Sequence, residues 1–298
     1  MTQPRSIHQG ATYLLTRRVV QRRFLLRPDA AMTQFILYSL AFAADAHGVE
    51  INAFCAMSTH IHMVVTDPNG VLPRFLRCFH HLVAMGTKIL RRWSGPVWDH
   101  ARTSVVELLT PQAIVEKIAY TLANPVSARV VEYAHQWPGA KNLVADIGGK
   151  PLQIGRPTIY FDPKKPRWTP NAIIEVRLPP MIAAVDLKKF QHNIAKLIVI
   201  EEAKARKKAP KKSNATKHRA AIISPYKRAT SREPERKRNL AFAAGHGNAD
   251  VCTAATSALQ SFHVSYRRAL EQWRAGDRNV RFPKGTWWMR EFHGANVQ

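Results

Sequence analysis

Residues 58–65 of the chain read Ser-Thr-His-Ile-His-Met-Val-Val. The alternation predicts a β-strand, because successive side chains of a strand point to opposite faces. His60 and His62 then share one face, where two imidazoles can bind the same metal ion. A strand edge with two solvated histidines gives the same pattern, and the pair taken alone favours that interpretation.

A predicted helix lies further along the chain. Residues 112–123 have a helical pattern, with Pro111 in the first turn and Pro125 as the stop. Tyr120 and Asn124 are four residues apart and would share a helix face. A tyrosine near the end of a helix is, by itself, most simply structural.

Taken together, these motifs resemble a known family. The His60-Ile61-His62 strand, a tyrosine sixty residues later and the sequence Tyr120-x-x-x-Asn124-Pro125-Val126 are similar to the single-tyrosine HUH transposases. The branch they resemble most is that of the REP-associated tyrosine transposases. Residues 97–102 and the pair Trp137-Pro138 add to this similarity, which covers about residues 8–140.

The chain departs from the family pattern at two places. Ser58-Thr59 stands where the family commonly has Pro-Asn, and Ser127-Ala128-Arg129 stands where it commonly has Arg-Ala-Gly. Both histidines and the tyrosine are present, so the departures concern DNA specificity more than the chemistry.

The resemblance implies a metal-dependent transposase that nicks single-stranded or hairpin DNA. Tyr120 would attack a backbone phosphorus, leaving a 5′-phosphotyrosine and a free 3′-hydroxyl. Mg²⁺ or Mn²⁺ would be held by His60, His62 and a third ligand, and would neutralise charge on the phosphate. Asn124 lies where the family has a polar ligand, whereas Glu116, one turn before Tyr120, offers the stronger carboxylate ligand. Both remain candidates.

The nucleophile has an energetic cost. A free phenol has a pKa near 10, so ionising it at neutral pH costs roughly 4 kcal/mol. A nearby dication and arginines would lower that pKa.

The composition favours a polyanionic partner. The chain has 298 residues, a net charge of +25 and 46% hydrophobic residues. Such a charge indicates nucleic acid first and an anionic membrane second. No apolar run approaches the roughly 18 residues of a spanning helix, and no signal peptide is recognisable. We therefore expect a cytoplasmic, nucleoid-associated protein without a membrane partner, as a monomer or homodimer.

Cysteine usage agrees with that compartment. Cys55, Cys78 and Cys252 are far apart, which argues against a disulfide framework or a zinc ribbon. We expect them to be reduced.

The order of predicted elements is strand, helix, strand, strand, helix, strand, helix. They span residues 11–20, 28–48, 51–57, 58–65, 72–91, 103–109 and 112–123. This order predicts a ferredoxin-like α+β fold, in which helices cover one face of a four-stranded antiparallel sheet. The family resemblance implies the same fold, with the histidine strand central and the tyrosine helix beside it.

Three domains are predicted: a catalytic domain at residues 1–140, a proline-rich connector at 141–180 and a basic, helical extension at 181–298. A short strand is expected at 173–178, and helices are expected at 185–205 and 248–275. Residues 204–238 contain fourteen Lys and Arg against two Glu. Such a block is usually a solvated tail, and it can also bind nucleic acid.

Basic side chains elsewhere are candidate DNA contacts. They are Arg17 on the first strand, and Arg74, Arg77 and Lys88 on one face of the helix at 72–91. Each of them alone is equally typical of a solvated surface. Near the C-terminus, Trp287 and Trp288 among basic residues could stack on bases. Packing against the core is the favoured interpretation for these two.

Three other functions compete. A non-catalytic DNA- or RNA-binding protein of the same fold would keep the basic surface, although the retained His60, His62 and Tyr120 favour catalysis. An RNA-binding module ranks lower, because the sequence has no strand rich in exposed aromatics. A zinc hydrolase would need more ligands than can be assembled.

Overall fold

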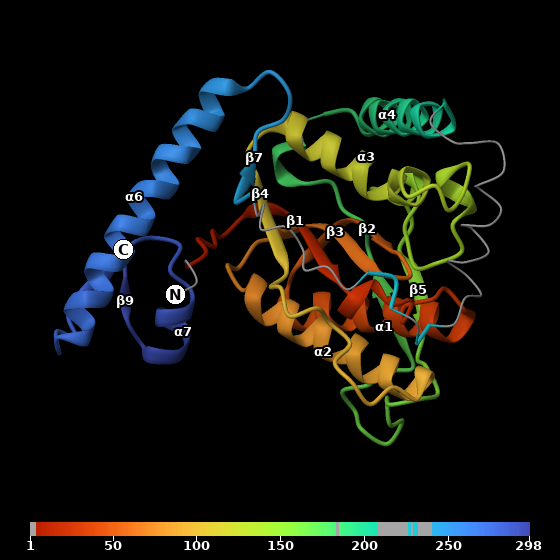
Figure 1. Cartoon of the computed structure of the whole chain (residues 1–298), viewed down its shortest axis with the longest axis horizontal. Helices are drawn as coiled ribbons and strands as arrows, with labels where there is room; N and C mark the ends of the chain where they lie inside the picture. Colours follow the sequence, from red (N-terminus) through yellow and green to blue (C-terminus); the bar gives the residue numbers. More distant parts are fainter. Residues whose placement is uncertain (1–3, 183–184, 208–225, 228, 232–239) are drawn as a thin grey trace.

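The central sheet of the protein has five strands in the order β2-β3-β1-β4-β7 (Figure 1). The computed structural model describes residues 4–182, 185–207, 226–227, 229–231 and 240–298. The strands of the sheet are β1 (Ala11–Arg18), β2 (Glu50–Ala56), β3 (His60–Asp67), β4 (Ser104–Leu108) and β7 (Phe242–Ala243). Neighbouring strands are antiparallel, except that β7 runs parallel to β4. The predicted α+β class and antiparallel core are confirmed, and β7 is an unpredicted fifth strand.

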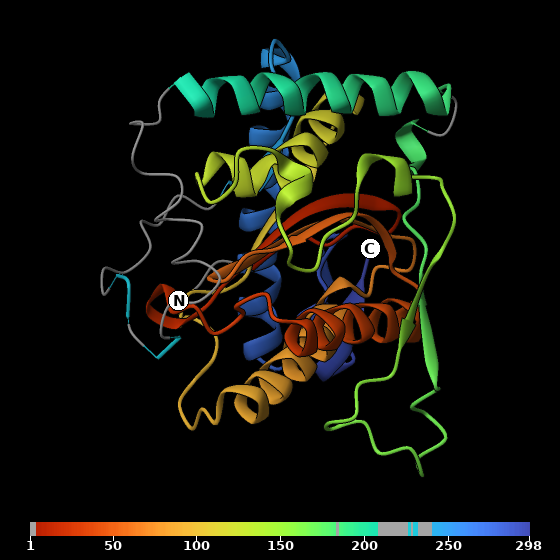
Figure 2. The same cartoon turned by 90° about the vertical axis from the view of Figure 1, so that its right-hand side faces the viewer.

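Helices cover both faces of this sheet. They are α1 (Ala30–His47), α2 (Leu72–Arg91), α3 (Pro111–Ser127) and α4 (Leu187–Lys207). Figure 2 shows α1 and α2 on one face and α3 on the other, with α4 packed on α3. The expectation that all helices lie on one face is therefore wrong. The reason lies in β3, where Val64 and Val65 point to opposite faces and both have no exposed surface, so each face needs a cover.

Helix α1 begins and ends as the sequence predicts. The Asp29 side chain accepts a hydrogen bond from the Met32 backbone N–H at 3.0 Å, which caps the helix start. Gly48 ends the helix in the left-handed conformation, with φ of 61°. Helices α1 and α2 approach closely at Gly86, where an added Cβ would lie 2.2 Å from the ring of Phe35.

Helix α3 carries Tyr120 and runs further than predicted. Thr110 caps its start through a hydrogen bond from Ala113 N at 3.1 Å, and Pro111 occupies the first turn as expected. Pro125 lies inside the helix, which continues to Ser127, so the prediction that Pro125 stops it is wrong. A proline this close to the end removes only one backbone donor, and the last turn tolerates that loss.

Residues 141–180 pack against the part of the chain that precedes them. They form a hairpin of β5 (Leu152–Gly155) and β6 (Asn171–Ile174), which contacts α1. The strand expected at 173–178 therefore occurs slightly earlier. Phe161 and Trp168, in the loop of the hairpin, are buried. The division of the chain into domains stays a prediction.

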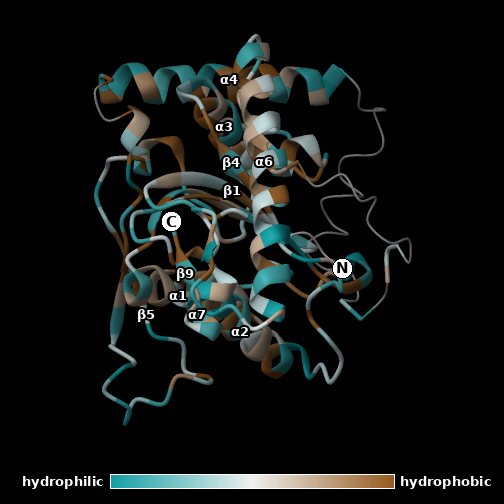
Figure 3. Cartoon of the chain, turned by 90° about the vertical axis from the view of Figure 1, so that its left-hand side faces the viewer, coloured by the Kyte–Doolittle hydropathy of each residue, from teal (hydrophilic) through white to brown (hydrophobic). Residues whose placement is uncertain are grey.

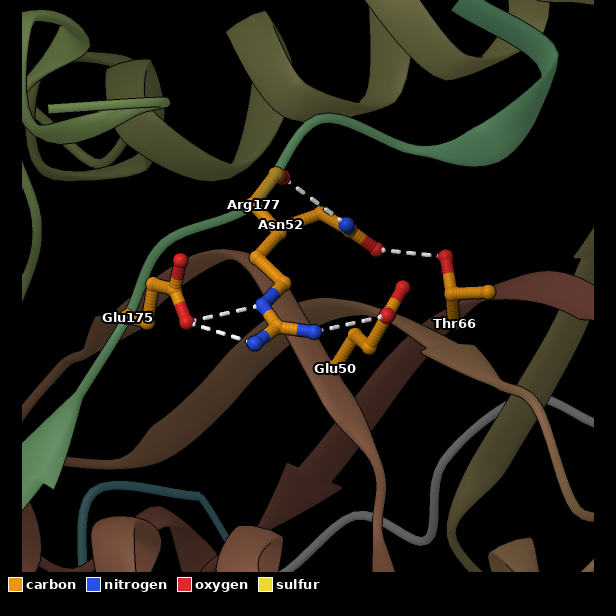
Figure 4. A network of polar contacts seen from close by, with 5 residues as sticks. All are labelled: Glu50, Asn52, Thr66, Glu175 and Arg177. Carbon is orange, nitrogen blue, oxygen red and sulfur yellow. Dashed lines mark hydrogen bonds and ion pairs between the residues drawn. The ribbon is translucent and has the colours of Figure 1, made fainter. Parts of the chain in front are cut away.

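A polar network fixes the segment that follows β6 to the sheet (Figure 4). The Arg177 guanidinium donates to Glu175 at 2.6 Å and to Glu50 at 3.1 Å. Asn52 Nδ2 donates to the Arg177 backbone carbonyl at 2.9 Å, and the Thr66 hydroxyl donates to Asn52 Oδ1 at 2.9 Å. Strands β2 and β3 therefore hold this segment in place.

The C-terminal part forms a long helix and a small cluster beside it. It consists of α6 (Ala249–Arg274), β8 (Arg281–Phe282), α7 (Trp288–His293) and β9 (Asn296–Val297). Figure 3 shows α6 running along one side of the molecule, with hydrophilic and hydrophobic residues interspersed. The expected packing of the tryptophan pair holds for one of them: Trp287 is buried, whereas Trp288 is 57% exposed.

Most of the basic block at residues 204–238 lies outside the described residues. Its first residues complete α4, which ends at Lys207. Two further described residues of the block contact the turn after β1, where the backbone N–H groups of Thr230 and Ser231 donate to the Gln21 carbonyl. Among the helices that the structure describes, none combines the length and apolarity needed to cross a membrane.

Candidate metal and nucleophile site

Strand β3 presents both predicted histidines on the sheet face that α3 covers. We call this the histidine face. The two imidazole rings meet edge to face, with centroids 4.7 Å apart. Each Nδ1 is hydrogen-bonded at 2.9 Å to a threonine hydroxyl, Thr59 for His60 and Thr16 for His62. These bonds fix the ring orientations, as outer hydrogen bonds do for histidines that bind metals.

Helix α3 brings the predicted nucleophile to the same place. The Tyr120 ring lies edge to face with His62, and their centroids are 5.2 Å apart. One turn later, Asn124 Oδ1 is 3.0 Å from His60 Nε2. Tyr120 remains 42% exposed, so an external phosphate can reach the phenol. The structure thus gathers four predicted site residues, whose catalytic and metal-binding roles stay predictions.

Burial keeps both histidines neutral. Desolvation lowers the pKa of His60 to about 4, against a smaller opposing effect of its hydrogen bond to Asn124. The pKa of His62 lies well below its usual value, again through desolvation first. A neutral imidazole is the form that binds a metal ion, so at neutral pH no proton would have to leave these two side chains for a metal to bind.

The phenol is not activated by the protein alone. Burial raises the pKa of Tyr120, while Arg18 and a hydrogen bond with Asn124 lower it by less. The expected lowering by arginine is present, and desolvation outweighs it. The Lys117 ammonium lies 6.0 Å from the centre of the Tyr120 ring and adds positive charge on the same helix.

The donors at this site are uncharged, and their binding of a divalent cation stays a prediction. Within the part of the chain that the structure describes, no three His, Cys, Asp or Glu side chains gather around a common point. The available donors are the two imidazoles and the Asn124 amide oxygen, and none of them carries negative charge. Such a set leaves the cation's charge available to a phosphate and suits Mn²⁺ better than Mg²⁺.

Of the two candidate third ligands, Asn124 contacts His60, one of the two predicted metal-binding histidines. Glu116 Oε1 instead accepts hydrogen bonds from the His246 backbone N–H at 3.1 Å and from Gln112 Nε2 at 3.0 Å. The geometry favours Asn124.

Arg18 is a site residue that sequence reasoning did not select. In the antiparallel register of β1 and β3, Arg18 stands opposite His60 and therefore lies on the histidine face. Arg17, which was selected, stands opposite Ile61 and points to the other face. There its guanidinium donates to the Ala101 carbonyl at 2.5 Å and lies over the Trp98 ring. The signal that identifies Arg18 is its pairing partner in β3, which local sequence does not reveal.

The other predicted DNA contacts lie away from this site. Arg74, Arg77 and Lys88 belong to α2, which covers the face opposite the histidines. The guanidinium of Arg74 forms an ion pair with Glu291 of α7. DNA binding by these three residues stays a prediction, and it would be separate from the tyrosine.

The solved structures that match this chain include two transposases. A structure of the REP-associated tyrosine transposase bound to a REP hairpin is 20% identical, with a TM-score of 0.39, and the match covers 49% of this chain and 84% of that one. A crystal structure of a candidate transposase from Deinococcus radiodurans R1 is 20% identical, with a TM-score of 0.28 and coverage of 32% and 76%. The first belongs to the family that the motifs of this chain resemble. No family model and no curated protein matches the chain. At this level of similarity, neither structure assigns an activity to this protein.

Proposed function

We propose that the protein is a transposase that nicks and rejoins a DNA strand through Tyr120. The observation that carries the proposal is the convergence of the Tyr120 ring on His62 and of Asn124 on His60. A tyrosine with a purely structural role would not need two hydrogen-bonded histidines beside it. It would also not need the positive charge of Arg18 near a partly exposed phenol. The substrate is single-stranded or hairpin DNA, in keeping with the net charge of +25.

In the proposed reaction, Tyr120 Oη attacks a backbone phosphorus and loses its proton. The bond between phosphorus and the 3′-oxygen breaks, and that oxygen takes up a proton to become a free 3′-hydroxyl. The downstream fragment stays linked to the tyrosine through its 5′ phosphate, as a phosphodiester. Reversal by another 3′-hydroxyl rejoins the strands, which separates this activity from simple hydrolysis.

His60, His62 and Asn124 would hold the divalent cation, which polarises a phosphate oxygen when bound. Arg18 would contact the phosphate, because it lies opposite His60 and lowers the pKa of the phenol. Burial of His62 strengthens these charge interactions, since electrostatic effects grow in a region of low dielectric.

The test is covalent capture of DNA. A single-stranded oligonucleotide labelled at its 3′ end is incubated with protein and Mn²⁺, and the products are separated on a denaturing gel. Wild-type protein should carry the label, because the tyrosine keeps the 5′ phosphate of the downstream fragment. Tyr120→Phe should abolish the adduct, whereas Tyr133→Phe, at another exposed tyrosine, should leave it unchanged.

A non-catalytic DNA- or RNA-binding protein of the same fold remains the second candidate. It predicts retention of the oligonucleotide on a native gel without any covalent product. An adduct that persists in Tyr120→Phe would rule out Tyr120 as the nucleophile.

A further inference from the structure

A large cavity opens beside the β4 edge of the sheet, at a distance from the tyrosine. Its volume is about 1120 Å³, and its walls come from β4, β7, α6 and residues 4–8. Figure 1 shows α6 standing next to the β4–β7 edge, which forms this side of the sheet. The cavity therefore lies between the edge of the sheet and α6.

Hydrogen bonds fix these walls to one another. The Ile7 backbone N–H donates to the Gly285 carbonyl at 3.0 Å, and the Glu107 N–H donates to the Ala241 carbonyl at 2.9 Å. His263 Nε2 on α6 is 3.3 Å from the Pro4 carbonyl oxygen. Of these three contacts, the one made by His263 involves α6 itself, and it links α6 to the N-terminal segment.

The lining of the cavity has a net positive charge. Arg5, Arg102 and Lys284 line it, and Glu107 is the one acidic residue among the described residues of its wall. The Glu107 carboxylate lies 4.0 Å from His8 Nε2. Burial lowers the pKa of Arg5, and the nearby positive charges of Arg102 and Arg17 lower it further. Arg5 donates a hydrogen bond to the Thr103 carbonyl, and the grouped positive charges favour an anionic ligand.

The remaining wall is apolar. Phe242, Leu259 and Phe262 line the cavity between the cations. A small inorganic anion would satisfy the charges and leave this apolar surface unused. A nucleotide has both a negative phosphate and a flat apolar base, which is the combination that binders of single strands recognise.

We propose that this cavity binds a short stretch of single-stranded DNA, with phosphates at Arg102 and Lys284 and bases against Phe242 and Phe262. The choice of DNA rests on the proposed function. Tyr13 lines the cavity, and Arg18 lies five residues further along β1 on the opposite face of the sheet, the histidine face. That separation is about 17 Å along a strand, so the bound nucleotides lie away from the scissile phosphate.

Removing charge tests the phosphate contacts. Binding of a fluorescent twelve-nucleotide thymidine strand is measured in the Tyr120→Phe protein, so that the result does not depend on nicking. Arg102→Ala combined with Lys284→Ala should raise Kd by about fivefold or more and reduce the salt slope by about 1.4, or about 0.7 per phosphate. Lys164→Ala combined with Lys165→Ala removes the same charge at exposed positions outside the cavity and serves as the control. Equal Kd values and slopes for the two pairs would overturn the proposal.

Filling the cavity tests whether bases enter it. Ala258 on α6 is exposed and lines the cavity, whereas Ala254 is exposed on the same helix and does not line it. Ala258→Trp should weaken binding of the strand by about fivefold or more, as expected when base stacking is lost, while Ala254→Trp should leave it unchanged. An abasic strand of the same length should bind the parent protein more weakly than the thymidine strand. Unchanged binding in Ala258→Trp, or equal affinity for the abasic strand, would show that the strand contacts only surface charges. Either result would refute the binding of bases in the cavity. Failure of Tyr120 to form an adduct would leave all these results unaffected.

Discussion

Arg18 illustrates how one residue position decides electrostatics at the candidate site. It faces His60 across the β1–β3 pair, and its charge lowers the pKa of Tyr120 against the raising effect of burial. A fixed cation at this place can stabilise both a phenolate and the extra charge that develops on a phosphate during attack.

We therefore expect Arg18→Ala to slow adduct formation about 100-fold or more, as loss of one preorganised charge donor typically does. The measurement is the single-turnover rate at saturating protein, which separates chemistry from binding. Arg18→Lys should recover part of the rate, because it keeps the charge and loses the planar fork. Arg268→Ala, at an exposed arginine of α6 outside the cavity, is the control and should keep the wild-type rate. A rate for Arg18→Ala within twofold of wild type would exclude a role for this residue in the chemistry.

Local periodicity was enough to find part of this site. Alternation along residues 58–65 predicted that His60 and His62 share a face, and a spacing of four predicted the same for Tyr120 and Asn124. The structure has both arrangements. The choice between Arg17 and Arg18 depends on how β1 is aligned with β3. That alignment joins segments more than forty residues apart, and no local pattern contains it.

At the scale of elements, the contact between α1 and α2 depends on a missing side chain. Gly86 lies within α2, where glycine is less favourable than alanine by about 1 kcal/mol. An added Cβ would overlap the Phe35 ring at 2.2 Å. The close approach of the two helices therefore explains why a glycine stands in the middle of a helix.

Gly86→Ala should lower the free energy of unfolding by about 1–3 kcal/mol, because overpacking outweighs the gain in helix propensity. Urea denaturation followed by circular dichroism measures it. Phe35→Leu combined with Gly86→Ala should restore part of the loss, so the two changes should be non-additive. A Gly86→Ala protein as stable as wild type would show that the helices can separate without cost.

The elements themselves were largely predictable, and their exceptions have physical causes. Helix α2 has the predicted limits, because its apolar stripe is long and regular. Strand β7 has only two residues, Phe242 and Ala243, and exists because β4 offers free backbone groups at the sheet edge. Helix α3 passes Pro125 because buried contacts on its last turn hold the chain in helical geometry. Tertiary contacts decided both cases.

For the whole molecule, buried histidines make folding sensitive to acid. Desolvation lowers the pKa of His60 to about 4 and that of His80 to about 3. In the unfolded chain a histidine has a pKa of about 6.5. Between these values the unfolded chain binds more protons than the folded one, so the free energy of unfolding decreases as pH falls below about 6.5. Each such histidine should cost about 2 kcal/mol by pH 5.

His80→Phe isolates one of these contributions without touching the tyrosine site. The Nε2 atom of His80 is buried without a hydrogen-bond partner in the described structure, and its ring lies 5.3 Å from that of Trp98. Between pH 7 and pH 5, in the presence of a chelator, His80→Phe should lose about 2 kcal/mol less stability than wild type. His192→Phe, at an exposed histidine, should follow the wild-type curve. Identical pH dependence in His80→Phe and wild type would mean that His80 is hydrated in the folded state.

Strand β1 has a further consequence for how this chain can evolve. Its residues alternate between the tyrosine side, reached by Thr16 and Arg18, and the reverse side, reached by Leu15 and Arg17. Inserting or deleting a single residue within β1 would turn the side chains on one side of the change to the opposite face of the sheet. The position opposite His60 would then be occupied by a neighbour of Arg18 in the sequence, Arg17 or Val19. A point substitution in this strand changes one side chain, whereas a change of length moves several side chains to the wrong face at once. Relatives of this protein should therefore vary in length in the connections before and after β1, and keep its eight residues without gaps.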